Sequence, residues 1–197
     1  MIEQQPAPQD MNNEAQAEMP VVVTKPKKSV GREMLEWVVS IVGAVAVALL
    51  IRHLLFEPVR VDGHSMEATL HNGEIMIVTK PEYLLGNPNR FDVVICHYPN
   101  RGNTTFVKRV VGLPGDTVEI KDGYLFVNGD MYAEDYLVHR PNYNYPAYTV
   151  PEGKYFVLGD NRSNSNDSHL VGPLDRSMII GHVRQVVFPF SGFRSIE

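Results

Sequence analysis

The stretch TTFVKRVVGLPGD, Thr104 to Asp116, decides the fold because it joins a strand pattern to a turn signal. Side chains alternate between the two faces of an extended strand, so Lys108 shares a face with the apolar Phe106 and Val110. The segment Leu113–Asp116 then has proline and glycine at the positions that a type II turn favours. The stretch predicts a half-buried β-strand that ends in a tight turn.

The same pattern of short apolar runs, bounded by Gly, Pro, Asn and Asp, recurs along the chain. The runs are IMIV (75–78), FDVVICHY (91–98), TFVKRVVG (105–112), DTVEI (116–120), YLFV (124–127), KYFVLG (154–159) and HVRQVVF (182–188). KDG and VNGD are typical of hairpin turns, and no amphipathic helix of ten or more residues stands out. We therefore predict a mainly β domain with antiparallel strands. The tyrosine-rich segment 132–149 is expected to be an extended excursion rather than regular sheet.

An apolar segment near the N-terminus predicts a membrane anchor. Between Trp37 and Ile51 only a serine and a glycine interrupt the apolar side chains. Extension to Phe56 lets a helix cover the ~30 Å hydrocarbon core if Arg52 snorkels toward the head groups. A core helix would show a polar face, and a cleaved signal would end at a small-x-small site, which RHLLFEPVR lacks. We predict one uncleaved transmembrane helix over residues 34–56.

Charge predicts the topology of the chain in the membrane. Four basic residues precede the anchor, namely Lys25, Lys27, Lys28 and Arg32. The positive-inside rule then places the N-terminus in the cytoplasm. Residues 1–33 are predicted to be a disordered cytoplasmic tail that ends in this basic cluster. Residues 57–197 would form an extracytoplasmic β domain at the cell membrane.

Composition limits the classes of function. The 197 residues include one cysteine, Cys96, which excludes an internal disulfide and a four-cysteine zinc site. A net charge of −5, without a basic stripe, argues against nucleic-acid binding. There is no HExxH motif, and we expect neither a metal nor a cofactor. Peptides and the lipid bilayer are the expected partners.

Two segments contain candidate catalytic residues. In VDGHSMEATL (61–70), Ser65 is either a nucleophile or one more loop hydroxyl. Lys108 lies among apolar residues of its strand, where burial would lower its pKa and make it a base. The alternative is a lysine that snorkels from a sheet edge. Neither segment decides the question alone.

A third segment, GDNRSNSNDSHLVGPLDRSMIIG (159–181), follows an apolar strand and is densely polar. Its spacing of oxygen-bearing side chains lacks the bidentate glutamate of a calcium loop. It is either a solvated turn or a hydrogen-bonding loop that orients a catalytic group.

In this order after an anchor, the three segments resemble those of the bacterial type I signal peptidases (leader peptidases), in the single-anchor form common in Gram-positive bacteria. The matching motifs are GHSMEATL, FVKRVVGLPGD and GDNRSNSNDS, and the resemblance covers about Gly31 to Phe188. It implies a membrane-bound serine endopeptidase that removes N-terminal signal peptides from exported preproteins.

The resemblance also implies roles for individual residues. Ser65 would attack the scissile carbonyl and form an acyl-enzyme, and neutral Lys108 would take its proton. Ser165 would help to hold the lysine amine, and the backbone N–H of Ser65 would donate to the oxyanion. The framework of the third loop would consist of Gly159, Asp160, Asn161 and Arg162.

Three positions depart from the family pattern. Gly63 stands where some members have a serine that completes the oxyanion hole, so a second donor must come from the backbone or be absent. Ala68 stands where proline is usual. His169 replaces an arginine that pairs with Asp167, and a histidine pairs in this way only when protonated, which would make the loop sensitive to pH.

The position of Ser65 suits cleavage near a membrane, because nine residues after Phe56 keep it within about 30 Å of the surface. An extended substrate would add to a sheet edge, with small residues in shallow pockets.

Two other classes remain open. One is a serine hydrolase with a histidine base, for which the candidates are His64, His71, His97, His139 and His182. The other is a catalytically inactive, membrane-tethered β domain that binds peptides. The sequence leaves open which preproteins are cleaved and the oligomeric state.

Overall fold

The computed structural model describes residues 30–196 except 68, 100 and 103. The tail and the lysines of the basic cluster lie outside the described residues. Residues 1–43 and 44–197 form two separate units, which we describe one at a time.

Helix α1 (Val30–Leu55) begins four residues before the predicted anchor. Its segment Val30–Arg52 is long and apolar enough to cross a membrane. The side chains of residues 30–52 are exposed all round; Trp37, for example, is 71% exposed. A helix that is apolar on every face is typical of a membrane span or a buried core. The helix ends at Leu55, one residue before the end of the predicted anchor, because Phe56 pairs with Thr79 as the first residue of a strand.

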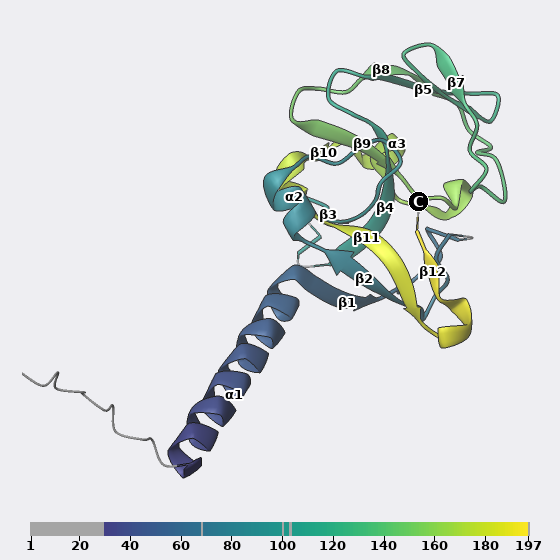
Figure 1. The fold of residues 1–197 in the computed structure, drawn as a ribbon. Coiled ribbons are helices and arrows are strands. Elements are labelled where there is room, and N and C mark those ends of the chain that lie inside the picture. The colour runs from purple at the N-terminus through teal and green to yellow at the C-terminus, as the bar shows by residue number, and fades with distance from the viewer. Residues whose placement is uncertain (1–29, 68, 100, 103, 197) are drawn as a thin grey trace, which may run out of the picture. The chain divides into compact units, whose positions relative to one another are not determined.

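An antiparallel eight-stranded sheet forms the larger part of the second unit (Figure 1). Its order is β1-β2-β11-β3-β4-β9-β10, with β12 paired to β11. The strands are β1 (Phe56–Arg60), β2 (Ile75–Thr79), β3 (Val93–His97), β4 (Thr105–Gly112), β9 (Lys154–Leu158), β10 (Leu174–Asp175), β11 (Ile179–Phe188) and β12 (Arg194–Ser195). The prediction of a mainly β, antiparallel domain is confirmed.

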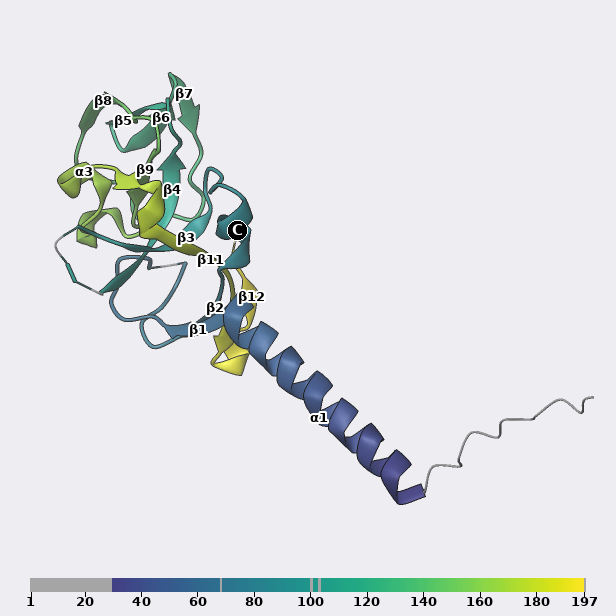
Figure 2. The ribbon, with the colours of Figure 1, turned by 90° about the vertical axis from the view of Figure 1, so that its left-hand side faces the viewer.

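A four-stranded sheet of order β7-β6-β5-β8 makes up the rest of the unit (Figure 2). Its strands are β5 (Thr117–Lys121), β6 (Tyr124–Val127), β7 (Asp130–Tyr132) and β8 (Tyr145–Thr149). The predicted hairpin turns are both confirmed, since Asp122 and Asn128 have φ of 53° and 56° and each precedes a glycine with positive φ. The predicted turn after β4 is also present, closed by a hydrogen bond from the Asp116 N–H to the Leu113 carbonyl.

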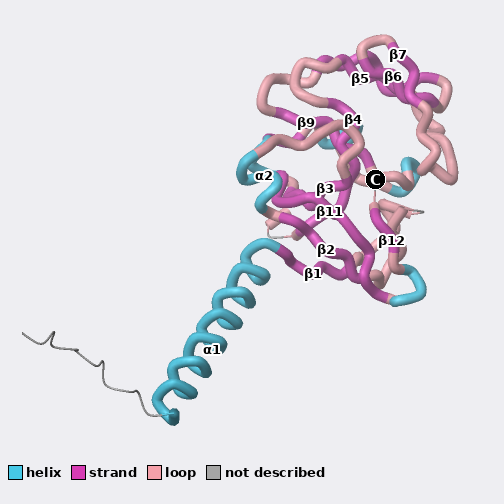
Figure 3. The backbone as a smooth tube through the Cα atoms, in the orientation of Figure 1, coloured by secondary structure: helices cyan, strands magenta, loops and turns pink. Residues whose placement is uncertain are grey.

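The expectation for the tyrosine-rich segment was half right. Residues 133–144 contain no strand, as Figure 3 shows, but Tyr145–Thr149 forms β8 on the edge of the small sheet. Pro146 made this strand hard to predict from the sequence. Proline is tolerated on an edge strand, where its missing N–H costs no hydrogen bond to a neighbouring strand. The remaining helices are short: α2 (Pro81–Leu85), α3 (Ser168–Val171), η1 (Arg162–Asn164), η2 (Arg176–Met178) and η3 (Phe190–Gly192).

The core consists of three apolar clusters separated by the sheets. The first includes Met66 and Leu70, which anchor the loop between β1 and β2 against strands β2, β3 and β11. The second packs around β3, β4 and β9, and the third lies between β5, β6 and the end of β4. The loop that contains Ser65 is thus fastened to the core by two buried side chains.

Candidate active site

The nucleophile loop, residues 62–70, is held at both ends. Met66 and Leu70 are 2% and 0% exposed, and the Leu70 N–H donates to the Met66 carbonyl at 2.9 Å. Asn161 clamps the segment just before them: its backbone N–H donates to the Ser65 carbonyl at 2.9 Å, and its side-chain amide donates to the His64 carbonyl at 3.0 Å. These bonds fix the backbone on which Ser65 sits.

Ser65 meets Lys108 in the folded chain, 43 positions away in sequence. The Lys108 Nζ and Ser65 Oγ atoms lie 2.7 Å apart, within hydrogen-bond distance. Lys108 is 1% exposed and stands on β4 opposite Val94 of β3. The alternative of a lysine that snorkels from a sheet edge is therefore wrong, because β4 pairs with β3 on one side and β9 on the other and the Lys108 side chain is buried.

The electrostatics of Lys108 suit a base. Burial lowers the pKa of this amine below its ordinary value, because a charged ammonium loses its hydration. The nearby carboxylates of Asp167 and Asp160 oppose this shift without cancelling it. A lysine with a lowered pKa is more often neutral, and only the neutral amine accepts a proton.

Ser165 lies close to the Ser65–Lys108 pair but makes no hydrogen bond to another described residue through its Oγ atom. It is 9% exposed and packs against Gly159. A β-carbon on Gly159 would lie 2.2 Å from Ser165 Oγ and 2.5 Å from the Ser65 carbonyl oxygen. Gly159 therefore lets the third loop approach the Ser65 backbone, and Ser165 lies beside the Ser65–Lys108 pair without a hydrogen bond to it.

A buried ion pair ties the three motifs together. Asp160 accepts from the Arg109 Nε at 3.0 Å and from its Nη2 at 2.9 Å, and both side chains are almost completely buried. Thr69 donates to the same carboxylate at 2.5 Å. Three residues, one from each motif, thus meet at this point. Their hydrogen bonds hold Arg109, the neighbour of Lys108 in β4, in place.

Asp167 supports the third loop from inside. Its Oδ2 accepts from the Gly159 N–H at 2.9 Å, and its Oδ1 lies 2.5 Å from the His169 Nδ1. The His169 ring stacks on Tyr143, with ring centroids 4.2 Å apart. The histidine that departs from the family pattern therefore stands next to Asp167.

Of the other two departures from the family pattern, the structure describes Gly63. Gly63 has φ of 107°, in the region that favours glycine, and its N–H donates to the Asn72 side chain at 3.0 Å. A serine at this position would be strained, so a hydroxyl donor there has a conformational cost. Ala68 lies outside the described residues.

Sequence reasoning missed a second buried pair, between Arg162 and Glu134. The Tyr136 ring also covers the Arg109 guanidinium at 4.0 Å. Both partners come from the segment between β7 and β8. A single glutamate in a loop gives no signal of burial, so these contacts could not be read from the sequence.

A groove runs beside Ser65. It has a volume of about 330 Å³, and strand β1 with its continuation forms one wall while the start of β4 forms the other. Its lining includes Val61, Ser65, Met66, Ile95, Phe106 and Val107. The lining thus combines these apolar side chains and the Ser65 hydroxyl with the polar side chains of Arg60, Asp62, Thr104 and Thr105.

The geometry does not favour a histidine base. Among the described residues, the hydrogen-bond partner of Ser65 Oγ is Lys108 alone. His64 turns toward Glu67, with Nδ1 3.1 Å from Oε1. His182 lies between Glu82 and Asp92, at 3.2 Å and 3.8 Å.

Comparison with known proteins agrees with the resemblance seen in the sequence. The family model described as "Signal peptidase, peptidase S26" matches residues 34–188. A signal peptidase I of Bacillus licheniformis is 42% identical, over 83% of this chain and 94% of its own length. The signal peptidase I T of Bacillus subtilis (strain 168) is also 42% identical, over 83% and 90%.

A solved signal peptidase I from Enterococcus faecalis V583 is 38% identical, with a TM-score of 0.43, and covers 49% of this chain and 97% of that chain. The family model spans both the predicted nucleophile and the predicted base. The chain therefore belongs to the signal peptidase family, peptidase family S26.

Proposed function

We propose that the protein is a membrane-bound serine endopeptidase that removes N-terminal signal peptides from exported preproteins through a Ser65–Lys108 dyad. The observation that supports this most directly is the 2.7 Å distance between Ser65 Oγ and Lys108 Nζ. The lowered pKa of the buried lysine adds the chemical requirement for a base.

The dyad accounts for both halves of the reaction. Neutral Lys108 takes the Ser65 proton while Oγ attacks the scissile carbonyl, and the backbone N–H of Ser65 donates to the oxyanion. Collapse of the tetrahedral intermediate breaks the C–N bond, and the leaving amine receives the proton from Lys108. Lys108 then removes a proton from water, and the water oxygen attacks the acyl-enzyme. The Oγ–C bond breaks, Ser65 Oγ takes the proton back from Lys108, and the signal peptide leaves with a free carboxyl group.

The groove suits the substrate. Its two walls are extended backbone segments, so a peptide can lie between them as an additional strand. Alternate side chains of such a peptide point into the groove, and its limited volume favours small residues. Cleavage sites of secretory signals have small residues in the A-x-A pattern.

Membrane attachment follows from α1 in this proposal. Residues 1–33 would be a cytoplasmic tail, α1 the single anchor, and residues 57–197 the extracytoplasmic catalytic domain. Protease added outside spheroplasts should digest the catalytic domain and spare a tag placed at the N-terminus. Digestion of the tag with protection of the domain would refute this topology.

The dyad is tested by Ser65→Ala and Lys108→Ala in the full chain, with cleavage of a precursor that has an A-x-A site as the readout. Each should abolish cleavage while circular dichroism stays unchanged, and the double variant should be no worse than either single one. Lys121→Ala is the matched control, because this lysine is exposed on β5.

Three results distinguish the proposal from its rivals. Activity retained in Lys108→Ala and lost in His64→Asn would favour a histidine base. A wild-type chain that binds signal peptides but cuts none would favour an inactive binding domain. Loss of cleavage in both dyad variants, with the control unaffected, supports the dyad.

A further inference from the structure

Two cavities adjoin the nucleophile loop, and the groove is only one of them. The second has a volume of about 360 Å³ and is lined by Glu67, His71 and Asn161, with Asp160, Val138 and His139 completing it. The two cavities share no lining residue, because the groove takes Gly63, Ser65 and Met66 from the loop. The loop therefore separates them.

The second cavity begins next to the backbone of Ser65. Asn161 lines it and also donates its backbone N–H to the Ser65 carbonyl at 2.9 Å. Glu67 is two positions from Ser65, which is at most about 7 Å along an extended chain. A peptide with its scissile bond at Ser65 can thus reach the cavity within about two residues.

The charge in this cavity comes from Glu67. The other carboxylate, Asp160, is neutralised by its buried pair with Arg109. The Glu67 side chain is 38% exposed, and its Oε1 lies 3.1 Å from the His64 Nδ1 and 4.0 Å from the His71 Nδ1. Glu67 is therefore the carboxylate of this cavity that has no arginine or lysine partner among the described residues.

We propose that the second cavity receives the first residues after the scissile bond, which become the start of the mature protein. In this arrangement Glu67 selects for lysine or arginine and against acidic residues at those positions. The inference rests on the proposed function and adds a specificity determinant to it. The groove, which takes other residues of the nucleophile loop, would then hold the end of the signal peptide.

The test compares quenched-fluorescence peptides that share an A-x-A site and differ only in having lysine or glutamate at the first, second or third residue beyond it. At pH 8 and low salt, the lysine peptide should have a kcat/KM about two- to fivefold higher at one or more positions, as expected for a half-exposed ion pair. Glu67→Gln should bring the ratio close to one, and Glu67→Lys should invert it.

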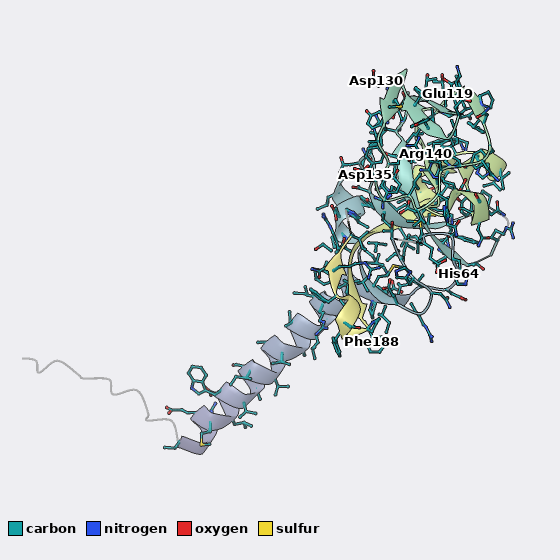
Figure 4. The ribbon with its side chains drawn as sticks, turned by 90° about the vertical axis from the view of Figure 1, so that its right-hand side faces the viewer. His64, Glu119, Asp130, Asp135, Arg140 and Phe188 are labelled. Carbon is teal, nitrogen blue, oxygen red and sulfur yellow. The ribbon has the colours of Figure 1, made fainter. Side chains whose placement is uncertain are left out.

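The matched control is Asp130→Asn, which removes an exposed carboxylate at the start of β7. Figure 4 shows Asp130 at one end of the β domain and His64, the neighbour of Ser65, well away from that end. This variant should keep the wild-type ratio. A concentration of 1 M NaCl should lower the wild-type ratio toward one, because salt screens exposed charges.

The ratio cancels any effect that a variant has on both peptides equally. A wild-type ratio of one at all three positions, or an unchanged ratio in Glu67→Gln, would overturn the inference while the dyad stands. Failure of the wild-type chain to cut any peptide would instead overturn the proposed function, and the inference with it.

Discussion

Gly159→Ala should inactivate the protein without unfolding it. A β-carbon at this position would lie 2.2 Å from Ser165 Oγ, 2.5 Å from the Ser65 carbonyl oxygen and 2.6 Å from Ser165 Cβ. Contacts below 3.4 Å are already tight, so the Ser65 carbonyl or the third loop must move by about 1 Å. A displacement of about 1 Å at a catalytic group can cost about 10²-fold in rate.

The expected result is therefore a fall in kcat/KM of about 10²-fold or more, measured with an A-x-A peptide. Overpacking of this kind costs about 1 to 3 kcal/mol in the free energy of unfolding, which denaturant titration measures. The domain should remain folded by circular dichroism. Because the φ of Gly159 lies outside the left-handed region, the loss would come from the clash and not from backbone strain.

Gly192→Ala is the matched control, since the nearest atom to its β-carbon would be Glu74 Oε1 at 3.5 Å, an ordinary contact. It should keep full activity. The reasoning fails if Gly159→Ala retains more than about a tenth of the wild-type kcat/KM with its fold intact.

Three further predictions follow from the residues around the dyad. The kcat/KM should rise with pH until Lys108 of the free enzyme has lost its proton. Asp167→Asn should move this rise to lower pH, because the Asp167 carboxylate raises the pKa of Lys108. A rise at the same pH in the variant would exclude that influence. Arg109→Met should lower the free energy of unfolding by about 3 to 5 kcal/mol, because it leaves Asp160 buried without its partner; a loss below about 1 kcal/mol in denaturant titration would contradict this. His169→Arg should raise the melting temperature, because arginine is always charged and can make a bidentate pair with the buried Asp167 carboxylate; an unchanged or lower melting temperature would argue against it.

Local pattern was enough to predict much of the fold. Apolar runs with turn residues between them identified the strands that are now β2, β3, β4, β5, β6, β9 and β11. Positive φ at Asp122 and Asn128 confirms the hairpins, because the turn type depends on those residues and their following glycines. The order of strands in the sheet was not predictable, since β11 lies between β2 and β3 through contacts far apart in sequence.

Part of the candidate site could likewise be predicted from local pattern, and the rest depends on the tertiary fold. Alternation along β4 predicted the apolar face on which Lys108 lies, and the motif order suggested its partner. The contact with Ser65 itself depends on the tertiary fold, as does the burial of Glu134 beside Arg162. The role expected for Ser165 stays a prediction, because its Oγ makes no hydrogen bond to another described residue.

The buried Lys108 also links folding to the proton concentration of the medium. A lysine whose pKa is lowered in the folded chain binds fewer protons there than in the unfolded chain, where its pKa is about 10.4. Stability then rises with pH wherever the unfolded chain holds more protons, which is the window from the folded pKa up to about 10.4. Lowering the pH through this window reduces the free energy of unfolding and also protonates Lys108, the proposed base. For this one residue, alkaline conditions favour both the native state and catalysis, in contrast to the usual antagonism between stability and activity.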